Sequence, residues 1–92
     1  MTNNSDVDYK ILKQLDPYDI YDVCLSNQYL YQLCLKDPYL HKAFQLRKNY
    51  EQDMEYMALH YPYMDTRILT RHKNVLYNKL LIQLDILQFN YS

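Results

Sequence analysis

The sequence predicts an all-α fold, a small orthogonal domain of four to five helices, and three observations lead to this prediction. Apolar residues recur every three or four positions along most of the 92-residue chain, which is the spacing of one helix face. Glycine is absent, so glycine-dependent hairpin turns and glycine-rich phosphate loops cannot be built. The three prolines fall between the periodic segments, where they begin or end helices. We therefore expect three short helices followed by two longer ones.

The first two helices are expected to meet at an aspartate-proline junction. Residues 1–5 are polar and aperiodic, and we interpret them as a flexible tail ending at a helix cap, Ser5 or Asp6. The apolar face of the first helix is formed by Val7, Ile11, Leu12 and Leu15, and this helix is expected to stop at Asp16. Asp16 and Pro17 have the residue types of an N-cap and a first helical position. The second helix then places Ile20, Val23 and Cys24 on one side.

Polar or proline-containing breaks delimit the next two helices. Ser26-Asn27 favours a break, after which the third helix presents Tyr29, Leu30, Leu33 and Cys34. Lys36-Asp37-Pro38 ends that helix and starts a fourth, because the residue before a proline avoids the α region. We expect the fourth helix to have about five turns. Its apolar positions are Leu40, Phe44, Tyr50, Met54, Met57 and Tyr61.

The last helix is expected to follow the Tyr61-Pro62-Tyr63 break, with Asp65 or Thr66 as its cap. Its predicted core-facing stripe is Leu69, Val75, Leu76, Leu80, Leu84 and Leu87. Near the end, Ile82, Leu84 and Ile86 alternate with polar residues, a pattern that a strand also produces. A single strand would have no partner here, so we interpret this segment as helix.

Length, charge and cysteine content limit the class of protein. The chain has room for one core, and its net charge of −1 argues against a nucleic-acid partner. Its apolar runs are far shorter than the roughly 18 to 20 residues of a membrane-spanning helix, so we expect a soluble, intracellular chain without a membrane partner. Cys24 and Cys34 have no companion metal ligands and are expected to be reduced, buried thiols, with a disulfide or a metal role as the alternative.

The polar residues do not form a pattern that predicts chemistry. The three histidines, His41, His60 and His72, lack metal-ligand spacing, and neither cysteine has an activating base nearby in sequence. Asp16 and Asp19 are explained by their positions at a helix N-terminus, and Arg67 with Arg71 by a solvated helix face. We therefore predict no catalytic residue, no metal, no cofactor and no small-molecule substrate.

Three sequence blocks resemble a known family. They are Leu15-Asp16-Pro17-Tyr18-Asp19-Ile20, then residues 23–34 ending in Cys34, then Asp37-Pro38-Tyr39-Leu40. Over residues 6–41 this pattern is similar to the F-box, of the kind found in large DNA viruses, and the tyrosine-rich composition suits such a source. The family's opening Leu-Pro corresponds to Asn3-Asn4 here, and its terminal Trp to His41.

The resemblance implies a function in protein interaction. An F-box docks on a Skp-type adaptor subunit of a cullin-RING ubiquitin ligase and catalyses nothing itself. The partner-binding residues that it implies here are Val7, Ile11, Leu12, Leu15, Pro17, Ile20 and Val23. Residues 42–92 would then be a helical extension packed on the F-box-like segment. The alternative is a small viral structural or regulatory protein that self-associates or belongs to a larger assembly. Either protein, if viral, would be located in the host cytoplasm or nucleus.

Overall fold

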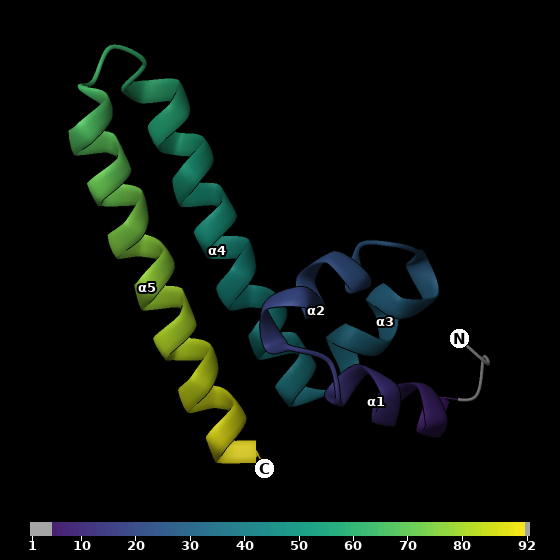
Figure 1. The fold of residues 1–92 in the computed structure, drawn as a ribbon. Helices are drawn as coiled ribbons and strands as arrows, with labels where there is room; N and C mark the ends of the chain where they lie inside the picture. Colours follow the sequence, from purple (N-terminus) through teal and green to yellow (C-terminus); the bar gives the residue numbers. More distant parts are fainter. Residues whose placement is uncertain (1–4, 92) are drawn as a thin grey trace.

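The computed structural model describes residues 5–91, and within them it is all-α, as predicted, with five helices and no strand (Figure 1). The helices are α1 (Ser5–Lys13), α2 (Pro17–Cys24), α3 (Gln28–Lys36), α4 (Pro38–His60) and α5 (Thr66–Tyr91). The three short helices gather around the first half of α4, while α4 and α5 form a long antiparallel hairpin (Figure 1). The molecule is consequently elongated, with extents of 49 × 27 × 16 Å.

Three side-chain caps determine where helices α2, α3 and α4 begin. Asp16 Oδ1 accepts a hydrogen bond from the Tyr18 amide at 2.9 Å, and Pro17 occupies the first turn of α2. Asn27 Oδ1 accepts one from Leu30 at the start of α3, and Asp37 Oδ2 one from Leu40 at the start of α4. Each cap satisfies an amide that has no partner within its own helix. The predicted breaks at these three places are confirmed.

Some boundaries differ from the predictions. Helix α1 ends at Lys13 and not at Asp16, because the amides of Gln14 and Leu15 form a turn with the carbonyls of Ile11 and Leu12. Helix α4 has 23 residues, which is more than six turns, since no breaker stands between its two flanking prolines. The expected tail at residues 1–5 lies outside the described residues except for Ser5, where α1 begins. The expected boundary at residue 42 falls inside α4.

The last helix is continuous to Tyr91, so its second half is helical as predicted. The Arg67 amide donates to Asp65 Oδ1 at 2.8 Å, which confirms Asp65 as a group that supports the helix start. Five of the six residues of the predicted stripe are buried or half-buried. Val75 is the exception, with 57% of its surface exposed, because it lies on the side of α5 that faces away from α4.

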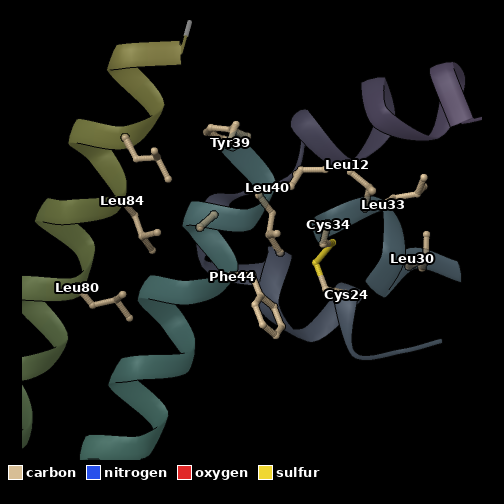
Figure 2. Packing of buried hydrophobic residues seen from close by; sticks show 13 residues of the cluster. Leu12, Cys24, Leu30, Leu33, Cys34, Tyr39, Leu40, Phe44, Leu80 and Leu84 are labelled. Carbon is tan, nitrogen blue, oxygen red and sulfur yellow. A yellow bond between two sulfur atoms is a disulfide. The ribbon is translucent and has the colours of Figure 1, made fainter. Parts of the chain in front are cut away.

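The core lies between the three short helices and the first turns of α4. Leu12, Ile20 and Leu40 are fully buried there, and Figure 2 shows how the side chains of this core lie around the start of α4. On the other side of α4, the core is completed by Leu80, Leu84 and Leu87 of α5. Beyond Arg47, Met57 is the only buried residue of α4. The far half of the hairpin thus extends away from the main core.

Cys24 at the end of α2 and Cys34 in α3 form a disulfide inside this core (Figure 2). Both residues are buried, as predicted, but the prediction that they are reduced thiols is wrong. The short turn between α2 and α3 brings two residues that are ten positions apart to a Cα–Cα distance of 6.2 Å. That separation lies within the range that a disulfide spans.

Candidate partner-binding surface

The seven residues predicted to bind a partner differ in burial. Leu12 and Ile20 are 0% exposed, and Pro17 is also buried. Leu15 and Val23 are half-buried and pack against the core. Val7 and Ile11 are exposed, at 42% and 39%. The seven residues therefore do not form one continuous exposed surface, because Leu12, Pro17 and Ile20 are buried in the chain's own core.

Two polar contacts hold α1, one with α3 and one with Asp37, which lies between α3 and α4. The Tyr29 hydroxyl donates a hydrogen bond to Asp8 Oδ2 at 2.7 Å, and Lys13 Nζ forms an ion pair with Asp37 Oδ1 at 2.7 Å. Asp8 lies near the start of α1 and Lys13 at its end, while Tyr29 lies near the start of α3 and Asp37 directly after its end. The two contacts therefore require the two helices to run in the same direction. Ile11 lies between the two attachment points. The backbone that carries this exposed side chain is thus held at both ends.

Asp8 is a buried carboxylate that we did not predict from the sequence, since an acidic residue in the first turn of a helix is already explained by the helix dipole. Its side chain is 0% exposed and receives the Tyr29 hydroxyl. The hydrogen bond from the neutral phenol to Asp8 raises the pKa of Tyr29, and burial raises it further. The protonated phenol is therefore the form that the fold stabilises.

Arg47 is a second buried polar residue, and it joins α2 to α4. Its Nη1 donates to the Tyr18 carbonyl at 2.7 Å and lies 3.4 Å from Asp22 Oδ2, while Nε donates to Glu51 Oε1 at 2.7 Å. The guanidinium carbon also lies 3.9 Å from the centre of the Tyr18 ring, a cation–π distance. The planar guanidinium can make all of these contacts at once, which a lysine cannot.

The surroundings of Arg47 stabilise its charge. Burial by itself lowers the pKa of the guanidinium, but the hydrogen bond to Glu51 and the charges nearby outweigh it, so the pKa is raised. Sequence reasoning missed this residue. The available signal was its spacing, because Arg47 lies three positions after the buried Phe44 and so interrupts the apolar face of α4. Its contacts join α2 to α4, and we assign it a structural role.

Tyr39 has the remaining unusual environment. Its hydroxyl is buried and, among the described residues, has no hydrogen-bond partner. Burial raises the pKa of Tyr39, and the negative charges of Asp16 and Asp37 add to this effect. The side chain lines a small cleft with Lys13, Gln88 and Tyr91.

The other candidate chemical groups are dispersed. All three histidines are exposed, and His60 stacks on the ring of Tyr56 with a centroid distance of 4.0 Å. Within residues 5–91, no three side chains of the types His, Cys, Asp and Glu are grouped as metal ligands would be. Of the helices in that part of the chain, none combines the length and the apolar character that a membrane span requires.

The fold and these surfaces define a small all-α domain whose apolar side chains are only partly used by its own core. Comparison with models of protein families, with curated proteins and with solved structures finds no match.

Proposed function

We propose that the chain is a non-enzymatic interaction module whose α1–α3 segment docks on a protein partner. The partner that the F-box-like pattern of residues 6–41 favours is a Skp-type adaptor of a cullin-RING ubiquitin ligase. The observation that supports docking is the position of Ile11, which is 39% exposed on a helix held by the Asp8–Tyr29 and Lys13–Asp37 contacts. An apolar side chain on a pre-ordered helix binds with a smaller entropic cost than one on a mobile segment.

The seven candidate residues then have two different roles. Ile11 is available for direct contact, and the half-buried Leu15 and Val23 can extend the contact at its margin. Leu12 and Ile20 are fully buried and act by holding α1 and α2 against α4. A substitution at Ile11 therefore tests docking, whereas a substitution at Leu12 tests folding.

The disulfide sets a condition on this proposal. A cullin-RING adaptor is a cytosolic protein, and the cytosol keeps most thiols reduced. The module must therefore bind with Cys24 and Cys34 as thiols. Both sulfurs lie in the core, where thiols pack as small apolar groups, so the arrangement of α2 and α3 is expected to survive reduction. Binding is accordingly measured both with and without a reductant.

The decisive experiment uses the full chain, a purified Skp-type adaptor and isothermal titration calorimetry. Ile11→Asp is compared with Gln14→Asp, which lies in the turn after α1, because both positions are exposed and both variants add one negative charge. A charge placed in a desolvated interface is left unpaired, so we expect Ile11→Asp to weaken binding by about a hundredfold and Gln14→Asp by less than about threefold. Circular dichroism must show that both variants remain helical.

Two results would contradict the proposal. One is a wild-type chain that does not bind the adaptor under either redox condition. The other is a folded Ile11→Asp variant that binds as tightly as the wild type. Leu15→Asp is a less informative variant, since Leu15 packs against the core and its replacement changes stability as well.

A further inference from the structure

Helix α5 carries a second apolar row that the core does not use. Ile68, Val75, Ile82 and Ile86 are each 56 to 59% exposed. The first three are spaced seven residues apart, and the fourth follows after four, which places all of them on one side of a helix. All four side chains are β-branched. We call these four residues the outer row.

The outer row lies opposite the part of α5 that packs on α4. At 100° per residue, Val75 and Ile82 point roughly 140 to 160° away from the buried Leu80. Leu84 and Leu87 share the inner side with Leu80 and complete the core. In Figure 1 the side of α5 that faces away from α4 has no other helix against it. Helix α5 is therefore apolar on two opposite sides, and the other helices of the described chain cover only one of them.

The size of the outer row suits an interface. Four β-branched side chains that are more than half exposed present on the order of 400 Å² of apolar surface, within the range of the largest patches on monomeric proteins, which are often functional. Two such rows in contact would bury about 800 Å², and the stems of flanking residues would bring the total past the roughly 1,000 Å² expected of a specific interface. Pairing of one row with an identical row is therefore large enough for a dimer.

The distribution of charge on α5 indicates how two copies would pair. From Thr66 to Lys79 the helix contains Arg67, Arg71, Lys73 and Lys79 and no acidic residue. From Leu80 to Tyr91 it contains Asp85 and no basic residue. A parallel pair would place the basic halves against each other, whereas an antiparallel pair places each basic half beside the half that carries Asp85. Antiparallel pairing also aligns the helix dipoles favourably.

We propose that the outer row is a homodimerisation surface, on which α5 of one chain packs antiparallel against α5 of a second copy. The two-fold axis passes near residue 78, between Val75 and Ile82. His72 and Lys79 interrupt the row at the intervening positions, so we expect a reversible dimer and not an obligate one. This surface is separate from α1 and does not depend on adaptor docking.

The test is sedimentation equilibrium of the full chain from about 1 to 500 µM. We expect the wild type to pass from monomer to dimer over this range. Ile82→Asp should raise the dissociation constant by about a hundredfold, because the added charge is buried at the centre of the interface. The matched control is Asn74→Asp, an exposed α5 position outside the outer row, which should dimerise like the wild type. Both positions are exposed, so neither change should lower the melting temperature by more than a few degrees.

The orientation is tested with spin labels on single cysteines introduced at Asn74 or Asn90, with the native pair kept oxidised. An antiparallel dimer gives a short distance between labels at residue 74, near the axis, and a distance above roughly 35 Å at residue 90. The proposal is overturned by short distances at both sites, by a wild type that stays monomeric at 500 µM, or by a dimer that Ile82→Asp leaves intact. A monomer that instead binds phospholipid vesicles through this row would also overturn it. None of these results bears on adaptor binding, which is measured with Ile11→Asp.

Discussion

Reduction of the Cys24–Cys34 disulfide should lower the free energy of unfolding without removing the fold. The bond closes a loop with a sequence separation of 10. The chain-entropy relation assigns about 2.7 kcal/mol at 25 °C to a loop of that length, through the restriction of the unfolded chain. Both thiols remain in the core after reduction, so little packing is lost in addition. Since small domains have about 5 to 15 kcal/mol of stability, the reduced chain should still be folded at 25 °C.

The assay is thermal unfolding followed by circular dichroism at 222 nm, with and without a phosphine reductant. For a domain of 60 to 100 residues, 1 kcal/mol corresponds to roughly 4 to 8 °C in Tm, so we expect a fall of about 10 to 20 °C. The control is the double variant Cys24→Ala with Cys34→Ala, whose Tm should be low and indifferent to reductant. A count of thiols in denaturant establishes the redox state of each sample.

Two outcomes would refute this reasoning. An unchanged Tm in a chain with two free thiols would mean that the bond contributes nothing to stability. Complete loss of helicity at 25 °C on reduction would mean that the three short helices depend on the bond, and docking in a reducing compartment would then be excluded.

Two further predictions concern Arg47 and three tyrosine hydroxyls. Arg47→Met removes the contacts with the Tyr18 carbonyl and Glu51, so the free energy of unfolding measured in urea should fall by about 1 to 3 kcal/mol. Arg47→Lys should lose more than half of that amount, because a lysine cannot make all of these contacts. An Arg47→Met variant as stable as the wild type would contradict the structural role. Stability should also fall as the pH rises above about 10, because three phenols have a pKa raised above 10.0 in the folded chain and therefore lose their protons more readily when unfolded. Measurement of Tm from pH 8 to 11.5 checks this, and a flat profile would refute it. The residues concerned are Tyr29, Tyr39 and Tyr50.

The parts of the fold that could be predicted are those determined by local chemistry. Asp16, Asn27 and Asp37 cap helices through contacts two or three residues away, so their effect can be recognised in the sequence. The continuity of α5 follows from helical periodicity and from the lack of a partner strand. Such contacts do not require knowledge of which elements meet in space.

The side of a helix that faces the core could not be predicted where apolar residues occupy two sides. Ile11 and Leu12 are neighbours of similar hydrophobicity, yet Leu12 is fully buried and Ile11 is exposed. Val75 and Leu76 present the same ambiguity on α5, where the outer row and the inner stripe overlap in sequence. Only the packing of α1 and of α5 against α4 decides which residue of each pair is the more buried.

Long-range polar contacts were also beyond sequence reasoning. Asp8 is buried because Tyr29, 21 positions later, donates a hydrogen bond to it. Arg47 is buried because Tyr18 and Asp22 lie across from it on another helix. The disulfide likewise depends on the turn that brings α2 and α3 together. In each case the contacting residue is brought close by the tertiary structure, and residue type and sequence spacing do not specify that structure.

Hydrogen–deuterium exchange of the reduced wild-type chain, with and without a purified Skp-type adaptor, tests the central proposal most directly. The proposal predicts that the adaptor slows amide exchange in α1 and in the segment from α1 to the start of α3. Exchange of the α5 amides should be unaffected. Contradiction would come from unchanged exchange throughout at saturating adaptor, or from protection confined to the α4–α5 hairpin.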